Sequence, residues 1–555
     1  MLNYKKYKRV PVLHYPEREW SDKEIEHAPM WCSVDLRDGN QALIDPMNVE
    51  EKMEMFRLLL KLGFKQIEIG FPAASQIEYD FLRKLVAENM IPDDVQVQVL
   101  TQCREHLIDR TFEAIQGIKN VIVHIYNSTS VLQRDVVFHK DKEAIKQIAI
   151  EGTRMVKERA KNFDGNIQLE YSPESFTGTE VEFALDICTA VQDIWEPTPE
   201  NKIIFNLPAT VEMNTPNVYA DQIEWMHKHF KNRESIILSV HPHNDRGTGI
   251  AATELSLLAG ADRVEGTLFG NGERTGNIDI LNIAYNMFSQ GIDPELNIEN
   301  IKEIIEVYER CCKMDIDMRH PYAGKLVFTA FSGSHQDAIN KGVHALNERN
   351  TGIWEVPYLP INPADLSREY EPVIRINSQS GKGGAAFVLQ HAVGYRLPKE
   401  MHPEFGNIVK AASDAFGDEL KEEQIVDLFN REYVEFDGKY KLASHSFLEQ
   451  RELDGTTHTR FEGKIDVCGD MKEVAGVGNG PIDSFFQALA GIGVEGYEFV
   501  NYHEHAISRG SDAKGICYIE LKIPGNGHIF GVGIDSNINV AALLGILCAI
   551  NRAEK

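Results

Sequence analysis

The first half of the chain alternates between short apolar runs typical of β-strands and longer segments with helical periodicity. Eight such runs span residues 30–36, 65–72, 95–102, 120–127, 166–173, 202–209, 235–243 and 261–270. Each is followed by a segment that suits a helix, because its apolar residues recur at intervals of three and four. Strands that alternate with helices form a parallel sheet. Eight units over about 270 residues suit a closed (β/α)8 barrel, which we place at residues 30–320.

A doubly wound open sheet is the alternative arrangement for such a pattern. A dinucleotide-binding sheet would carry a GxGxxG turn after its first strand, and that turn is not found there. The chain has 555 residues, too many for one ordinary core, so we expect further domains beyond the barrel.

The composition is that of a globular protein, with 43% hydrophobic and 25% charged residues. Its net charge of −27 disfavours nucleic acid and anionic membranes as partners. An anionic substrate remains compatible with this charge, because arginines and a metal can reverse the sign within a pocket. The eight cysteines include no CxxC pair, the N-terminus lacks an apolar signal core, and no apolar run is long enough to span a membrane. We expect a cytoplasmic protein.

Polar residues gather at the carboxyl ends of five of the predicted strands. They are RDGNQ, SPESFTGTE, ATVEMNTP, HPHNDRGTG and GNGERTGN, after strands one, five, six, seven and eight. In a (β/α)8 barrel all of these ends share one face, and that face carries the chemistry. The sequence therefore predicts an active site at this face.

The HPHND segment indicates a divalent-metal site. His241 and His243 are two residues apart at a strand end, so both imidazoles project to one face. Two imidazoles and a carboxylate make a common ligand set, and Asp38 at the end of strand one can supply the carboxylate. Asn277 can add a neutral oxygen. Mg²⁺, Mn²⁺ or Zn²⁺ suits this set, whereas an unligated histidine pair at the surface is the alternative interpretation.

Arg37 stands beside Asp38, in a stretch where Asp35 and Asp38 flank a guanidinium. A surface ion pair is the simple interpretation. An arginine next to a metal ligand can instead stabilise an oxyanion or enolate, while the metal polarises the ketone of a 2-oxo acid. Ser172, Glu174 and Thr210 on strands five and six are placed to touch such a substrate, or they are polar packing at the barrel mouth. Asp35 receives no assigned role.

The remainder of the chain divides into a mostly helical linker at 321–435 and a C-terminal region at 436–555. Residues 1–29 form an N-terminal extension. The GKGG segment lacks the spacing of a phosphate loop, so a hinge or turn is preferred there. In the C-terminal region, two segments each read as GVG, a polar turn and an apolar helix, starting at Gly476 and Gly531. A duplicated βββα unit explains this repeat, and it serves a ligand site or dimerisation.

Several motifs together closely resemble the 2-isopropylmalate synthase family in its longer form. They are WCSVDLRDGNQALIDPM, EYSPESFTGTE, NLPATVEMNTPN, SGSHQDAINKG and VPYLPINPADLSREYEPVIRINSQSGKGG, with the whole of residues 241–277. The wider group comprises metal-dependent Claisen-type synthases and lyases on a (β/α)8 barrel. It includes homocitrate synthase, citramalate synthase and hydroxymethylglutaryl-CoA lyase.

The resemblance implies that acetyl-CoA, 3-methyl-2-oxobutanoate and water give 2-isopropylmalate and CoA, the committed step of leucine synthesis. It implies Asp38, His241 and His243 as ligands of the divalent metal, with Asn277 nearby; Mg²⁺ is preferred, and K⁺ is a candidate activator. The implied catalytic residues are Arg37, Glu174, His335 and Tyr358. The implied substrate-binding residues are Arg37, His124, Ser172, Glu174 and Thr210.

The resemblance also implies a homodimer in which His335 and Tyr358 reach the partner's active site. Either Glu174 or His335 is the expected base. The duplicated C-terminal domain is implied to bind leucine as a feedback inhibitor. Two other functions stay open at this point: a sister activity making citramalate or homocitrate, and a non-catalytic amino-acid sensor. The intact Arg37, Asp38, His241, His243 and His335 argue against the sensor.

Overall fold

The computed structural model describes residues 6, 12–372, 384–416, 420–435, 438–451, 457–507, 513–525 and 527–555. These residues divide into two compact units. One comprises Met1–Phe328 with Pro360–Tyr370, and the other comprises Thr329–Leu359 with Glu371–Lys555. Most of the GKGG segment, residues 381–383, lies outside the described residues.

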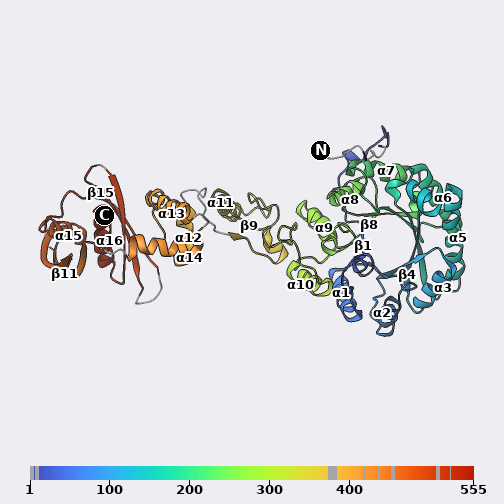
Figure 1. Ribbon diagram of the computed structural model, residues 1–555, viewed down its shortest axis with the longest axis horizontal. Coiled ribbons are helices and arrows are strands. Elements are labelled where there is room, and N and C mark those ends of the chain that lie inside the picture. Colours follow the sequence, from blue (N-terminus) through green and yellow to red (C-terminus); the bar gives the residue numbers. More distant parts are fainter. Residues whose placement is uncertain are drawn as a thin grey trace. The chain divides into compact units, whose positions relative to one another are not determined.

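The first unit contains a closed parallel barrel of eight strands, as predicted (Figure 1). The strands are β1 (Met30–Ser33), β2 (Gln66–Gly70), β3 (Gln96–Gln102), β4 (Asn120–Ser128), β5 (Asn166–Glu174), β6 (Ile203–Ala209), β7 (Ile236–Pro242) and β8 (Arg263–Gly266). The barrel closes where β1 pairs with β8, with Trp31 opposite Val264. Closure brings the carboxyl ends of all eight strands to one mouth.

Helices follow the strands and surround the barrel (Figure 1). The main ones are α1 (Val49–Leu62), α2 (Gln76–Ala87), α3 (Glu105–Ala114), α5 (Lys142–Ala160), α6 (Val181–Trp195), α7 (Pro216–His229), α8 (Gly249–Leu258), α9 (Ile280–Ser289) and α10 (Ile301–Cys312). Helix α1 shows how the sequence sets the boundaries. Asn48 and Glu51 form a reciprocal capping box at its start, and Gly63 ends it in a left-handed conformation with φ of 94°.

The first and last strands are shorter than the sequence predicts. Strand β1 ends at Ser33, and Asp35–Gly39 form a turn of π-helix, η3. The Asp35 carboxylate accepts hydrogen bonds from the Ser33 hydroxyl at 2.7 Å and from the Leu268 backbone N–H at 3.0 Å. It thus joins the ends of β1 and β8, and the chain turns where the apolar pattern alone suggests continued strand.

The barrel interior is unusually polar. Branched aliphatic side chains normally fill such an interior, yet here Ile122, Ile204 and Ile237 form only a small apolar cluster. Beside them lie fully buried polar and charged residues from several strands. These are Glu68, Gln98, Glu170, Ser239, Arg263 and Glu265. Burying charge is costly unless it is paired, so most of these side chains bond to one another. Glu170 accepts no hydrogen bond from the described residues and instead lies 3.4 Å from Arg263.

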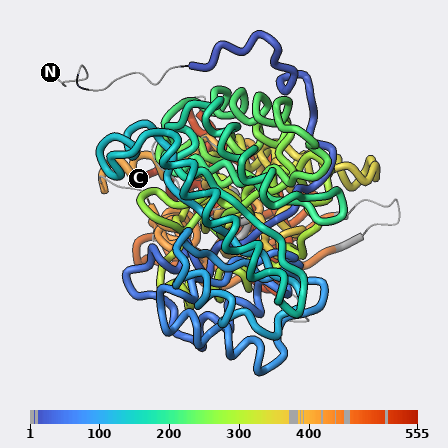
Figure 2. The backbone as a smooth tube through the Cα atoms, turned by 90° about the vertical axis from the view of Figure 1, so that its right-hand side faces the viewer, coloured from blue at the N-terminus to red at the C-terminus, as the bar shows by residue number. Residues whose placement is uncertain are grey.

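The N-terminal extension packs along α7, where Figure 2 shows its blue tube beside green helices. The buried Asp221 carboxylate accepts hydrogen bonds from the Arg18 guanidinium and, at 2.8 Å, from Trp20 Nε1. The buried Glu224 carboxylate accepts the backbone N–H of Glu19. Two buried carboxylates of α7 thus hold the extension in place.

The second unit contains helices followed by two copies of a βββα unit. The helices are α11 (Gly333–Arg349), α12 (Gly384–Val393), α13 (His402–Phe416) and α14 (Glu422–Phe429). The first copy is β11 (Tyr440–Arg451), β12 (Thr457–Val467), β13 (Asp470–Gly478) and α15 (Pro481–Ala490). The second is β14 (Glu498–Ala506), β15 (Gly515–Ile523), β16 (Gly527–Asp535) and α16 (Ile538–Ala553).

Both copies share one arrangement, which confirms the predicted duplication. Each has a three-stranded antiparallel sheet, in the order β11–β12–β13 or β14–β15–β16. Glycines let the helices lie close to the sheets: a Cβ at Gly476 would collide with α15, and one at Gly531 with α16. The GVG motifs recognised in the sequence are therefore the places where strand and helix touch. Among the described residues, none of the helices is both long and apolar enough to cross a membrane.

Candidate metal and substrate site

A cavity of about 190 Å³ opens at the carboxyl ends of the barrel strands. Eight of the predicted site residues line it. They are Arg37, Asp38, His124, Ser172, Glu174, Thr210, His241 and His243. Closure of the barrel therefore brings together residues more than 200 positions apart, as the strand-end reasoning predicts.

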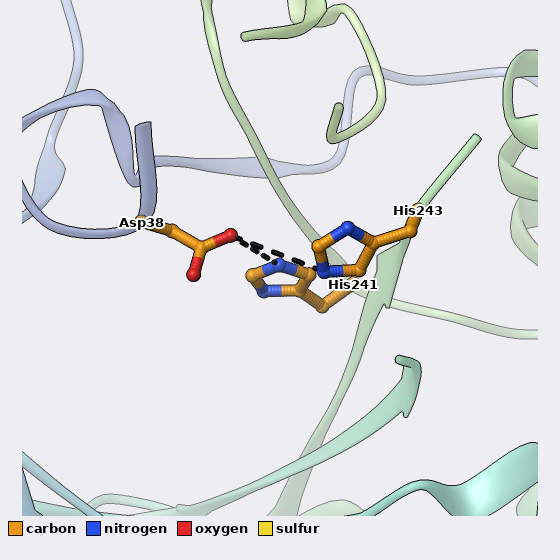
Figure 3. A group of neighbouring side chains, drawn as sticks. All are labelled: Asp38, His241 and His243. Carbon is orange, nitrogen blue, oxygen red and sulfur yellow. Dashed lines mark ion pairs between the residues drawn. The ribbon is translucent and has the colours of Figure 1, made fainter. Parts of the chain in front are cut away.

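Asp38, His241 and His243 place one ligand atom each within 4.8 Å of the others (Figure 3). Oδ2 of Asp38 lies 3.6 Å from Nε2 of His241 and 3.9 Å from Nε2 of His243. Ligands of an octahedral ion lie about 3 Å apart when adjacent and about 4 Å apart when opposite, because each bond is about 2.1 Å long. The spacing and the donor types thus fit one divalent cation.

Asn277 stands beside this group as the sequence predicts. Its Oδ1 lies 2.8 Å from His241 Nε2, and its Nδ2 donates to Asp38 Oδ2 at 2.8 Å. Gly276, with φ of 91°, lets the loop bring Asn277 this close, because a Cβ there would collide with the Gly270 carbonyl oxygen. The Asn277 oxygen is therefore available to the same cation.

The charges in the site favour an ionised Asp38. Burial alone would raise the pKa of Asp38, but Arg37, His241 and His243 hold it well below its usual value. Burial would likewise lower the pKa of His241, but the Asp38 and Glu265 carboxylates raise it to about 10. Burial and the neighbouring His241 charge lower the pKa of His243 to about 4. The charges around Asp38 and His241 therefore stabilise a positive charge at this position, whether it is a proton or a metal cation.

Arg37 is held between two carboxylates. Its Nε donates to Glu68 and its Nη1 donates to Asp38. Its side chain is almost buried yet lines the cavity, so the guanidinium can meet an oxyanion there without first losing its solvent shell. Asp35 takes no part in this arrangement, because its carboxylate faces Ser33 and the Leu268 backbone.

The buried Asp35 carboxyl group is expected to make the stability of the protein depend on pH. Burial raises its pKa to about 7, against a usual value near 4, despite the hydrogen bonds that it accepts. The folded state therefore holds this proton at pH values where the unfolded state has released it, and stability falls as pH rises from about 4 to about 7.

The Asp35→Asn variant keeps the two hydrogen bonds and removes the titration. We expect the difference in free energy of unfolding, Asp35→Asn minus wild type, to increase by about 1 kcal/mol for each pH unit between pH 5 and pH 7. Urea unfolding at several pH values measures this difference. An unchanging difference across that range would show that Asp35 is ionised throughout.

Four of the predicted substrate-binding residues, His124, Ser172, Glu174 and Thr210, lie on β4, on β5 and just after β6. Ser172 Oγ lies 2.7 Å from Nε2 of His124, and Nδ1 of His124 lies 3.0 Å from Oε1 of Glu68. Glu174 accepts a hydrogen bond from the Ser128 hydroxyl. The Thr210 hydroxyl accepts the Ser175 backbone N–H at 2.9 Å, so its own proton can point toward a substrate oxygen.

Residues 28–307 match the HMGL-like family, residues 325–390 the "Alpha-isopropylmalate synthase, post-catalytic domain-like" family, and residues 419–554 the "LeuA allosteric (dimerisation) domain". The 2-isopropylmalate synthase of Clostridium acetobutylicum is 55% identical over 99% of both chains. The chain belongs to the 2-isopropylmalate synthase family. The enzyme of the same name from Rhizobium johnstonii is 54% identical over 99% of this chain and 97% of that one.

Two residues that we predict to act in this 2-isopropylmalate synthase family member lie in the second unit. His335 is in the first turn of α11, and its ring stacks on Tyr358 with centroids 4.1 Å apart. Both side chains are exposed, and Tyr358 has a positive φ of 64°, which is unusual for a large side chain.

Sequence reasoning missed the buried residues behind this family's site. Glu68, Glu170, Glu265 and Arg263 all sit inside predicted strands, where charge is easily taken as outward-facing. A weak signal exists, because RVEG puts Arg263 and Glu265 two positions apart and hence on one face of the strand. His124, Glu170 and Glu265 also meet within 4.8 Å, but Arg263 already lies against both carboxylates and supplies the positive charge.

Proposed function

We propose that this chain condenses acetyl-CoA with 3-methyl-2-oxobutanoate and hydrolyses the thioester, releasing 2-isopropylmalate and CoA. One observation carries the proposal: the ligand-like trio Asp38, His241 and His243 shares a cavity with Arg37, Ser172 and Glu174 in a chain 55% identical to a 2-isopropylmalate synthase. A divalent cation held by three such ligands keeps open positions for an acceptor that offers two neighbouring oxygens, as a 2-oxo acid does.

Asp38, His241 and His243 would hold a divalent cation, Mg²⁺ by preference and Mn²⁺ or Zn²⁺ as alternatives, with Asn277 adding an oxygen. When bound, this ion supplies Lewis acidity that makes the ketone of the oxo acid electrophilic. Thr210 and Ser172 offer hydroxyl groups to the oxo acid, and His124 orients Ser172 through the 2.7 Å contact. Arg37 stands beside Asp38 on the cavity and would stabilise the oxygen that becomes negative during carbon–carbon bond formation.

The acetyl methyl group of acetyl-CoA is a weak carbon acid, so a base has to remove its proton. Glu174 and His335 are the two candidates. The enolate carbon then attacks the ketone carbon, and the new alkoxide takes a proton to become the tertiary hydroxyl. Water finally cleaves the thioester, which releases CoA as a thiol and makes the sequence irreversible.

We further infer a homodimer in which His335 and Tyr358 serve the barrel of the partner subunit, and feedback inhibition by leucine through residues 436–555. The match to the LeuA allosteric (dimerisation) domain and the duplicated βββα units support both inferences. K⁺ remains a candidate activator. The cytoplasm is the expected compartment, because all eight cysteines are free thiols.

The acceptor tests the proposed function. We expect 3-methyl-2-oxobutanoate to give the highest kcat/KM in an assay of thiol release from acetyl-CoA with Mg²⁺ or Mn²⁺ present. One methylene changes binding in an apolar pocket by only about 1–3 kcal/mol, so pyruvate and 2-oxoglutarate have to be compared in parallel. A higher kcat/KM for pyruvate would assign citramalate synthesis, and one for 2-oxoglutarate would assign homocitrate synthesis. If no acceptor gives thiol release, the alternative of a non-catalytic amino-acid sensor is supported instead.

A further inference from the structure

Glu265 on β8 lies directly behind the predicted metal ligand His241. Its Oε2 is 2.7 Å from Nδ1 of His241, and both side chains are buried. The other ring nitrogen, Nε2, faces Asp38 and Asn277. One imidazole therefore connects the ligand cluster to the interior of the barrel.

The Glu265 carboxylate is held by three further donors. Its Oε1 accepts hydrogen bonds from Arg263 at 2.8 Å and from Gln98 at 3.0 Å. Its Oε2 accepts a hydrogen bond from Asn206 at 3.0 Å, in addition to the one from His241. Arg263 is itself held by Gln66, by Ser239 and by the oxygen of Gln98. Both oxygens of Glu265 are thus used, and the carboxylate cannot rotate without breaking several bonds.

His243 has no comparable support. Its Nδ1 is buried and has no hydrogen-bond partner among the described residues, although its Nε2 faces the same Asp38 oxygen. The two histidines therefore differ: only His241 is oriented from behind. A carboxylate in that place fixes which nitrogen of an imidazole carries the proton and increases the basicity of the other.

We propose that Glu265 is a positioning residue that sets the metal affinity of the site by keeping the proton of His241 on Nδ1 and its Nε2 aimed at the cation. The inference rests on the proposed function in one respect, that Asp38, His241 and His243 bind the metal. It adds a residue that does not touch substrate or metal and acts through His241 alone.

The Glu265→Gln variant removes the carboxylate that orients His241, with little change in the shape of the side chain. A glutamine has one oxygen and one NH₂ group, so the two donors on the side of the replaced oxygen meet another donor instead of an acceptor. The charge that makes His241 a better ligand is lost as well. We expect the Kd for Mn²⁺ to rise about 10–100-fold, the range seen when such outer partners of a ligand are removed.

Glu170→Gln is the matched control. Glu170 is equally buried and lies 3.4 Å from the same Arg263. It contacts His124 rather than His241, and one of its oxygens lies within 4.8 Å of Glu265, so it tests a charge change in the same buried cluster. Burial and the neighbouring Glu265 charge raise the pKa of Glu170 well above its usual value. We expect its Kd for Mn²⁺ to stay within about threefold of wild type.

The experiment titrates Mn²⁺ into chelator-stripped full-length protein by calorimetry, with wild type, the two glutamine variants and Asp38→Ala. A weaker site in Glu265→Gln alone among the glutamine variants supports the proposal. Wild-type affinity in Glu265→Gln, or an equal loss in Glu170→Gln, overturns it. An unchanged Kd for Mn²⁺ in Asp38→Ala would instead exclude this cluster as the metal site, and with it the metal chemistry of the proposed function.

A measurement on the wild type covers the case in which Glu265→Gln does not fold. Nitrogen-15 NMR of histidine-labelled wild-type protein reports the protonated ring nitrogen of each histidine. We expect His241, assigned with a His241→Gln variant, to keep a proton on Nδ1 with and without Zn²⁺, and Nε2 to lose its proton and shift on Zn²⁺ addition. A proton on Nε2 of His241 in the Zn²⁺-loaded protein would overturn the proposal.

Discussion

The Asp38→Ala variant is expected to lose at least about 10³-fold in kcat/KM, equivalent to roughly 4 kcal/mol of transition-state stabilisation. Asp38 is the only carboxylate of the proposed ligand trio, and it also pairs with Arg37. Its removal leaves two imidazoles and an asparagine oxygen for the cation and frees the Arg37 guanidinium to move. Both the polarisation of the ketone and the stabilisation of the developing oxyanion should suffer.

The measurement combines steady-state thiol release with metal analysis of the purified variant. Asp45→Ala is the matched control, because Asp45 is an exposed carboxylate a few residues later that pairs with Lys313 rather than with the site. It should keep wild-type kcat/KM. Near-normal turnover and one metal per chain in Asp38→Ala would exclude Asp38 as a ligand.

Local patterns were sufficient to predict the barrel. Each strand is recognisable as an apolar run, and each helix by apolar residues that recur every three or four positions. Eight such units in succession allow few arrangements other than a closed barrel. The meeting of Asp38, His241 and His243 was predictable for the same reason, since they lie at strand ends, which closure must bring together. The βββα duplication was predictable because its two copies preserve the glycines that let α15 and α16 approach their sheets.

The residues behind the site were not predictable, because their partners lie on distant strands. Glu265 is recognisable as an internal residue only once His241 and Gln98 are known to face it. Arg263 meets Glu170 only because the barrel closes. The end of β1 was misjudged for a related reason: Asp35 bonds to the Leu268 backbone, more than 230 positions away, and no local pattern records that contact.

The proposed sharing of the active site between subunits predicts that two inactive variants restore each other. Arg37 lies in the first unit and His335 in the second, and we propose that they meet across the dimer. Arg37→Ala and His335→Ala should each be nearly inactive. After free subunit exchange, half of the dimers contain one of each, and every such dimer has one intact site of two. We therefore expect about one quarter of wild-type activity in a symmetric two-site dimer.

The matched control mixes Arg37→Ala with Asp38→Ala. Both changes lie in η3 of the same barrel, so no combination of subunits yields an intact site, and the mixture should stay inactive. Thiol release measures recovery, and native mass spectrometry verifies that mixed dimers have formed. If mixed dimers are present and Arg37→Ala with His335→Ala remains as inactive as the control, His335 does not serve the partner's barrel. Because the exposed His335 and Tyr358 rings stack on each other, the same exchange with Tyr358→Ala in place of His335→Ala should give the same recovery.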